Sequence, residues 1–236
     1  MTSGFERSND ILQVRAPGVN FHVLRDGHGL YLVDAGFIGG WNCLQRALRK
    51  RGWQKDPIIG ILVTHGHLDH VLNVGEFALR TGAWIAAPRL DLPHYTGQMR
   101  YQGLARVTGV LEALGRPILG FQSFTPDRLL DDGDTLDVWH GLRAVLLPGH
   151  TAGHMGFYCE SLRLLLTGDL FASYGWSTVL PPAIFSSEPA KMPASVARAL
   201  ELDLSGVLPN HGDRAAPEVH LKRLGRLHRR LSTKCH

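Results

Sequence analysis

The stretch Thr64-His65-Gly66-His67-Leu68-Asp69-His70 follows directly on the apolar run of residues 58–63. A near-continuous apolar run of this length is typical of a strand buried on both faces. The rigid end of such a strand fixes polar side chains in place, and the loop after it can aim them around an ion. Imidazole nitrogens and a carboxylate oxygen both suit zinc and related divalent ions. The segment therefore predicts a metal site at the end of a central strand.

Two simpler interpretations of this segment have to be weighed. A single histidine after a strand is usually a structural residue, and a histidine-rich turn can be solvated. Burying three histidines and an aspartate without a cation, however, would leave several polar groups without partners. Because adjacent residues in a turn or helix point in different directions, one such segment can also serve two metals. Residues elsewhere in the chain decide between these interpretations.

Three further segments repeat the pattern of an apolar run, a proline or glycine, and a metal-binding type of side chain. His150 follows Pro148-Gly149, Asp169 follows Thr167-Gly168, and His211 follows Pro209-Asn210. Glycine allows the backbone to approach its neighbours closely. Each signal is weak alone, but together they predict strand ends that converge on one rim.

This combination resembles the metallo-β-lactamase-fold hydrolases, over about residues 19–212. Asp34, within residues 31–36, matches the early aspartate of that family. The resemblance implies an α/β (α+β) fold, a four-layer αββα sandwich with the metal site at one edge of two sheets. Position by position, it implies a first metal on His65, His67 and His150, a second on Asp69, His70 and His211, a bridging Asp169, and Asp34 supporting the site through hydrogen bonds.

The resemblance and the chemistry of a metal pair imply a dinuclear metal-dependent hydrolase of a small ester, thioester or lactone. Two cations about 3.5–4 Å apart lower the pKa of a shared water and supply hydroxide at neutral pH. The two divalent ions are expected to be Zn²⁺, with Fe or Mn as alternatives, since His/Asp sites accept all three. Asp69 is expected to orient the nucleophile as well as bind metal. Tyr174 is expected to donate a hydrogen bond to a substrate carbonyl, like the pocket tyrosine of the lactonases that this chain resembles.

Departures from related branches narrow the expected activity. True β-lactamases of this fold lack a bridging aspartate, whereas this chain has Asp169 at that position. The resemblance is therefore greater to the glyoxalase II and lactonase branch. Only 25 residues follow His211, so the glutathione-binding helical domain of glyoxalase II is not expected. Alternatives stay open: an iron-dependent sulfur dioxygenase with one iron on His65, His150 and Asp169, a phosphodiesterase or a β-lactam hydrolase.

The composition excludes a disordered chain and locates the charge. The 236 residues are 44% hydrophobic and 19% charged, as in an ordinary single-domain globular protein. The net charge of +4 arises at the end: from Arg214 onward there are seven basic residues and one acidic, against 18 and 20 before it. This excess belongs to a basic helix expected at 217–231, interpreted as a solvated face whose leucines dock on the sandwich. An anionic partner such as nucleic acid is the less favoured alternative.

Cysteine use and the lack of long apolar runs bear on location. Cys43, Cys159 and Cys235 have neither zinc-ribbon nor disulfide-framework spacing. Residues 1–17 lack the apolar run of a signal peptide, and no stretch is long enough to span a bilayer. We therefore expect a cytoplasmic protein with a small-molecule substrate and no membrane partner. The oligomeric state, including a homodimer, is left open.

The remaining expectations concern local structure and the substrate pocket. A single domain over 1–236 is expected, with a helical insertion or lid at 88–127. His94, His140 and His154 are expected to be packing or supporting residues. Strands are expected at 11–14, 19–24, 30–33, 58–63, 84–87, 128–130, 135–139, 142–147, 155–159, 163–166 and 206–208, and helices at 41–51, 74–81, 104–114, 193–202 and 217–231. Candidates for an apolar pocket wall are Tyr95, Met99, Tyr101, Phe171, Tyr174 and Trp176.

Overall fold

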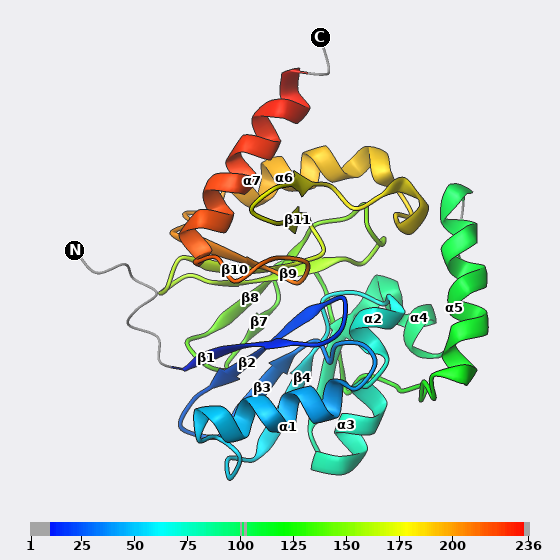
Figure 1. The fold of residues 1–236 in the computed structure, drawn as a ribbon, viewed down its shortest axis with the longest axis vertical. Coiled ribbons are helices and arrows are strands. Elements are labelled where there is room, and N and C mark those ends of the chain that lie inside the picture. The colour runs from blue at the N-terminus through cyan, green and yellow to red at the C-terminus, as the bar shows by residue number, and fades with distance from the viewer. Residues whose placement is uncertain (1–9, 100, 102, 234–236) are drawn as a thin grey trace.

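The computed structural model describes residues 10–99, 101 and 103–233, and its strands form two main sheets packed face to face (Figure 1). The first sheet has the order β1 (Ile11–Arg15), β2 (Asn20–Arg25), β3 (Leu30–Val33), β4 (Ile58–Leu62), β5 (Trp84–Pro88) and β6 (Arg128–Leu130). The second has the order β13 (Gly206–Pro209), β10 (Leu164–Gly168), β9 (Met155–Cys159), β8 (Leu142–Leu146) and β7 (Thr135–Leu136). A small hairpin joins β11 (Ala172–Ser173) to β12 (Thr178–Val179).

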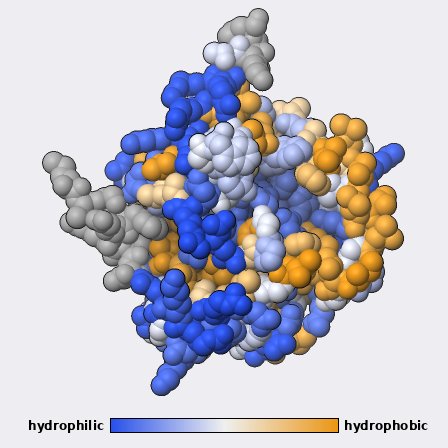
Figure 2. All heavy atoms as spheres, viewed as in Figure 1, coloured by the Kyte–Doolittle hydropathy of each residue, from blue (hydrophilic) through white to orange (hydrophobic). Residues whose placement is uncertain are grey.

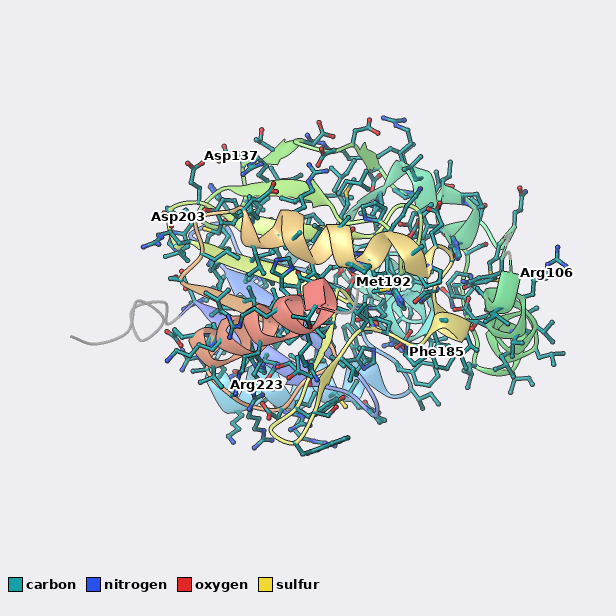
Figure 3. All side chains as sticks on the ribbon, turned by 90° about the horizontal axis from the view of Figure 1, so that it is seen from above. Arg106, Asp137, Phe185, Met192, Asp203 and Arg223 are labelled. Carbon is teal, nitrogen blue, oxygen red and sulfur yellow. The ribbon has the colours of Figure 1, made fainter. Side chains whose placement is uncertain are left out.

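Helices cover the outer face of each sheet. The first sheet carries α1 (Gly40–Arg51) and α3 (Val74–Thr81), and the second carries α6 (Met192–Leu200) and α7 (Pro217–Ser232) (Figures 1 and 3). The expected αββα sandwich is therefore confirmed. At one edge lie the shorter helices α2 (Leu68–Val71) and α4 (Leu92–Tyr95) and the longer α5 (Arg106–Ile118). Single 3₁₀ turns occur at η2 (Arg89–Asp91), η3 (Gly103–Ala105), η4 (Ala183–Phe185) and η5 (Pro189–Lys191).

Three apolar layers hold these elements together. Phe21 of β2 packs with Leu44 and other residues of the helices outside the first sheet, whereas Leu24 on the opposite face packs between the sheets. This separation follows from the two-residue alternation of a strand. A third layer, including Leu165 and Leu224, joins the second sheet to its helices. Each fully buried leucine or phenylalanine side chain contributes about 1.5–3 kcal/mol.

The strand directions bring the predicted site residues to one edge. Strands β3, β4, β5 and β6 run parallel, so their carboxyl ends meet at the same edge of the first sheet. In the second sheet β10 and β13 run parallel, and β8 shares their direction because both β8 and β10 pair antiparallel with β9. The loops after these strands carry the metal-binding types of side chain.

Several sequence-based boundaries need correction. The strand expected at 128–130 is present, and it pairs in parallel with β5 to complete the first sheet. The strand expected at 135–139 ends at Leu136, and the chain turns where Trp139 takes a φ of 57°. The helix expected at 104–114 begins at Arg106 and continues to Ile118. Gly115 and Pro117 are poor helix formers, but the buried side chain of Arg116 holds the last turn in place.

Helix α5 is oriented in an unusual way. It buries Thr108, Glu112 and Arg116, because these polar side chains find partners on neighbouring loops. Its apolar side chains are correspondingly exposed, and Figure 2 shows a hydrophobic band at this side of the molecule. The band on α5 comprises Val107, Val110, Leu111, Leu114 and Ile118.

The basic helix α7 docks as expected. Its leucines pack against the second sheet, with Leu224 and Leu227 fully or almost fully buried. Arg223 forms an ion pair with Asp213 at 2.9 Å, so part of the basic excess serves the fold. Cys159 is buried and Cys43 partly buried, while Cys235 lies outside the described residues. In the described part of the chain no helix combines the length and the apolar character needed to cross a membrane.

Candidate metal centre

The segment that predicted the site lies at the carboxyl end of β4. The backbone N–H and the hydroxyl of Thr64 both donate to the carboxylate of Asp34, at 2.8 Å each. The Thr64 hydroxyl also lies 3.0 Å from Nδ1 of His65. This arrangement occupies one ring nitrogen of His65 and leaves its Nε2 for another partner.

His65, His67 and His150 form the first cluster. One ring nitrogen of each lies within 4.8 Å of the others, and all three side chains are buried. Nδ1 of His67 and Nε2 of His150 are 2.8 Å apart. Burial, together with the neighbouring histidines, holds the pKa of both His65 and His150 well below the ordinary value. Both rings are therefore neutral at neutral pH, which is the form that binds metal.

Asp69, His70, Asp169 and His211 form the second cluster, again with one donor atom each within 4.8 Å of the others. Nε2 of His211 lies 3.0 Å from Asp169 and 3.3 Å from Asp69. The carboxylate of Asp169 raises the pKa of His211 to about 10, against the opposing effect of burial. Two carboxylates this close together call for positive charge between them.

Asp169 lies between the two clusters. Its Oδ1 is 3.2 Å from Nε2 of His70, and its Oδ2 is 3.5 Å from Nε2 of His150. The backbone N–H of Asp169 donates to His154 at 3.0 Å, and the other ring nitrogen of His154 lies 2.9 Å from the carbonyl of Leu147. Both nitrogens of His154 are thus occupied, which agrees with its expected supporting role.

Gly168 is required for this placement. Its φ is 53°, and a Cβ there would lie 2.7 Å from Nε2 of His154. A side chain would therefore both strain the backbone and displace the ring that holds Asp169.

The donor set fits divalent metal ions. Within the described part of the chain, Nε2 of His65 and Nε2 of His67 are buried without a hydrogen-bond partner. Nε2 of His70 and Oδ1 of Asp169 are buried and face each other at 3.2 Å without a hydrogen bond of good geometry. A buried polar group without a partner costs about 1–3 kcal/mol. Imidazole and carboxylate donors at such spacing are those that zinc, iron and manganese accept.

Asp34 supports the second cluster from behind. Its Oδ2 accepts a hydrogen bond from Nδ1 of His70 at 3.0 Å and from the amide of Asn210 at 2.6 Å. Asp34 has a φ of 65°, uncommon for a residue with a side chain. The sequence pointed to Asp34 but not to Asn210, which sits beside His211 and resembles any turn residue.

Asp91 was missed by the sequence analysis. Its carboxylate accepts hydrogen bonds from the backbone N–H of Gly66 at 2.9 Å, the hydroxyl of Thr151 at 2.6 Å and the backbone N–H of Gly153 at 2.8 Å. It therefore ties the loop of His65 and His67 to the loop of His150. The available signal was its place just after β5, a parallel strand that ends at the same edge.

Glu112 and Arg116 of α5 were missed as well. Glu112 accepts a hydrogen bond from the backbone N–H of Leu68 at 2.9 Å and pairs with Arg116 at 3.0 Å. Arg116 also donates to the carbonyl of His94 at 2.7 Å. The pair fixes α5 to the start of α2. Its signal was an i, i+4 Glu–Arg spacing opposite the apolar face of the helix.

A pocket of about 480 Å³ opens over both clusters. Phe171 and Tyr174 line it, as expected. Tyr101 stacks on the ring of His67, with centroids 5.8 Å apart. Of the six candidates for the wall, only Phe171 and Tyr174 line the pocket. Tyr101 is not among the lining residues, Tyr95 is buried in the core against Phe124, and Trp176 is 87% exposed and stacks on the ring of Tyr174.

The remaining wall candidate, Met99, and two of the histidines that were expected to be packing or supporting residues lie outside the pocket wall. Met99 is partly buried and is not among its lining residues. His94 packs against Tyr101 and His67, and His140 pairs with Asp10 away from the site.

Comparisons with known proteins agree with this geometry. The sequence pattern of the metallo-beta-lactamase superfamily matches residues 14–211. A probable metallo-hydrolase of Bacillus subtilis, YflN, is 24% identical over 232 residues, 89% of this chain and 86% of that protein. A hydroxyacylglutathione hydrolase of Methylobacterium nodulans is 28% identical over 144 residues, 59% of this chain but 44% of that enzyme. TTHA1623, solved in a di-iron-bound form, superposes with a TM-score of 0.64 at 25% identity, covering 89% of this chain and 96% of that one.

Proposed function

Because the chain belongs to the metallo-β-lactamase superfamily and is a metal-dependent hydrolase, we propose that its two clusters hold two divalent metal ions and cleave a small ester, thioester or lactone. The observation that carries the proposal is the position of Asp169. Its carboxylate faces His150 of the first cluster and both His70 and His211 of the second. A carboxylate between two donor sets has an oxygen for each of them, so it can be shared by two ions.

The seven residues divide as the two clusters do. His65, His67 and His150 would hold one ion, and Asp69, His70 and His211 the other, with Asp169 shared between them. A pair of divalent ions bound there would lower the pKa of a water and polarise a substrate carbonyl. We propose zinc as the native metal, with iron or manganese as alternatives, and a di-iron form of the similar TTHA1623 supports testing iron directly.

Two residues would act on the substrate side of the site. The carboxylate of Asp69 lines the pocket and is partly exposed. Partial desolvation acts to raise its pKa, but the nearby His70 and His211 outweigh this effect and hold the pKa below the ordinary value. The carboxylate therefore remains an acceptor that can orient a nucleophile. Partial burial, and the nearby charge of Asp169, raise the pKa of Tyr174. Its hydroxyl stays protonated at neutral pH and can donate a hydrogen bond to a substrate carbonyl oxygen.

The test combines metal analysis with a panel of hydrolysis substrates. We expect about two metal ions per chain, and turnover of thioesters or lactones that stops on chelation and returns with metal. Asp169→Ala and His150→Ala are expected to abolish nearly all turnover. Asp203→Ala, which removes an exposed carboxylate that pairs with Arg163 and belongs to neither cluster, serves as the control. Unchanged turnover in Asp169→Ala contradicts the proposal.

The same experiment decides between the alternatives. A sulfur dioxygenase using His65, His150 and Asp169 would hold one iron and consume oxygen with a persulfide substrate, without hydrolysing the panel. Phosphodiesters and β-lactams in the panel test the remaining activities. A cytoplasmic location and a homodimer stay predictions, to be checked by cell fractionation and by mass measurement in solution.

A further inference from the structure

We infer that the pocket takes a substrate with an uncharged apolar acyl group, and that a glutathione thioester is a poor fit. The inference rests on the proposed hydrolase function and adds the chemical class of the group that is cleaved. It is carried by the chemistry of the wall and by the way in which α5 is anchored.

The wall above the clusters is almost entirely hydrocarbon. It is built from α2, from α5, from the segment after β10 and from residues 179–185. Phe37, which follows β3, lines it as well, and the largest apolar side chains of the wall are those of Phe37, Leu68, Leu111, Leu119, Phe171, Leu180 and Phe185. A pocket of about 480 Å³ lined in this way suits one compact apolar group.

The charged side chains of the wall are acidic or belong to the clusters. Among its described residues there is no lysine or arginine, and the carboxylates are those of Asp69, Asp169 and Glu112. Glu112 is paired with Arg116 and accepts the N–H of Leu68, so it offers no free charge to a ligand. A substrate carboxylate placed against this wall, away from the ions proposed at the clusters, would have no cationic side chain as a partner, which is costly where the carboxylate is buried.

The anchoring of α5 makes this apolar wall. Because Glu112 and Arg116 point toward the loops of His67 and His94, Leu111 and Leu119 face the pocket. The hydroxyl of Thr108 donates to the carbonyl of Ile184, and this bond ties α5 to η4. Phe185 of η4 therefore lies on the side of the molecule that carries α5 (Figure 3) and lines the pocket with it.

Glutathione does not match these surroundings. It brings two carboxylates, for which the described wall offers no lysine or arginine, and an ammonium group that the apolar side chains of the wall cannot solvate. A neutral thiol or alcohol leaving group with an aliphatic or aromatic acyl chain has no such mismatch. The likeness to hydroxyacylglutathione hydrolases covers less than half of the length of the enzyme compared above.

The experiment uses the metal-loaded full chain with matched pairs of thioesters. Acetyl, butanoyl, hexanoyl and octanoyl groups are attached either to N-acetylcysteamine, which is neutral, or to glutathione. We expect kcat/KM to rise about two- to fourfold per methylene until the pocket is filled, and the neutral thioester to exceed its glutathione partner at least about tenfold at each length. A flat chain-length series, or faster turnover of the glutathione series, overturns the inference.

A pair of variants on α5 distinguishes the effect of a charge in the pocket wall from the effect of a charge elsewhere on the same helix. Leu111→Glu places a charge in the pocket and is expected to lower kcat/KM for the octanoyl thioester more than tenfold, with a smaller effect on acetyl. Leu114→Glu changes an exposed leucine outside the pocket and is expected to leave both values unchanged. Equal effects of the two variants contradict the inference.

A binding measurement keeps the inference separate from the proposed hydrolysis. Fluorescence of the neutral dye N-phenyl-1-naphthylamine on the metal-free protein reports an apolar pocket without turnover. We expect octanamide to displace the dye, and Leu111→Glu to weaken dye binding more than tenfold while Leu114→Glu does not. Dye binding without hydrolysis of any substrate would overturn the proposed function but not the apolar pocket. Hydrolysis confined to charged substrates would support the proposed function and overturn the apolar substrate class.

Discussion

Asp34 and His70 are joined by a hydrogen bond of 3.0 Å between a carboxylate oxygen and Nδ1, and both side chains are fully buried. The bond leaves Nε2 of His70 pointing at Asp169, 3.2 Å away. A ring nitrogen anchored in this way fixes the orientation of the imidazole and raises its strength as a ligand. Asp34 thereby connects the end of β3 to the second cluster.

Asp34→Asn is expected to weaken metal binding at the second cluster. An amide of the same shape loses the charge that anchors His70, and such supporting partners are worth about 10–100-fold in metal affinity. Competition with a chelator measures the dissociation constant. Asp203→Asn, which affects an exposed ion pair with Arg163, should leave the constant unchanged. Equal affinity in Asp34→Asn and the native protein would show that the bond does not support the ligand.

Asp91→Ala is expected to lower both stability and activity. Removing the carboxylate leaves the N–H groups of Gly66 and Gly153 buried without partners, at a cost of about 2–4 kcal/mol in the free energy of unfolding. The two loops that carry the first cluster also lose their connection. Urea unfolding and turnover of the same preparation measure the two effects. Asp131→Ala, which breaks an exposed ion pair with Arg89, should change the free energy by less than about 1 kcal/mol.

The different fates of Asp34 and Asp91 show what a single sequence can predict. Asp34 directly follows a short apolar strand and matches a family position, so its place and its supporting role could be expected. Asp91 depends on the parallel pairing of β5 beside β4, a long-range contact that no local pattern reports. Its neighbours Pro88 and Pro93 look like an irregular insertion instead. The pattern of strand ends predicts the two clusters. It does not predict that the carboxylate of Asp91 joins two of the loops that carry them.

Helix α5 illustrates a second limit. Its apolar positions recur at helical spacing and would normally be assigned to the core. The buried side is instead the polar one. There the N–H of Leu68 donates to Glu112, and the carbonyl of His94 accepts a hydrogen bond from Arg116. Periodicity predicts that a helix has two faces but not which face turns inward when both can be satisfied.

Tyr174→Phe tests the proposed donor on the substrate side. If the hydroxyl donates to the carbonyl oxygen as charge develops on it, kcat is expected to fall about 10- to 100-fold with little change in KM. The ring stays stacked on Trp176, with centroids 5.6 Å apart, so the free energy of unfolding should not change. Trp176→Leu removes the exposed stacking partner alone and is the matched control. A rise in KM or a fall in stability without a fall in kcat would assign Tyr174 to packing.

His22→Leu tests a pH dependence that arises far from the clusters in sequence. His22 lies on β2, fully buried, and neither ring nitrogen has a hydrogen-bond partner in the described part of the chain. Burial, reinforced by His220, lowers the pKa of His22 from 6.5 to about 3. The unfolded chain therefore binds a proton between these values that the folded chain does not. Above about pH 6.5 this group has no effect on the free energy of unfolding. As the pH falls from 6.5 toward 3, the free energy of unfolding decreases.

Leucine at this position removes the titrating group and fills a similar volume with hydrocarbon. Between pH 7 and pH 5 the native protein should lose about 2 kcal/mol more of its free energy of unfolding than His22→Leu does. Urea unfolding of both proteins at the two pH values measures the difference. Val23→Ala, a change without a titrating group on the same strand, should lower stability equally at both. Parallel pH curves for the native protein and His22→Leu would mean that the ring of His22 is not kept neutral by the fold.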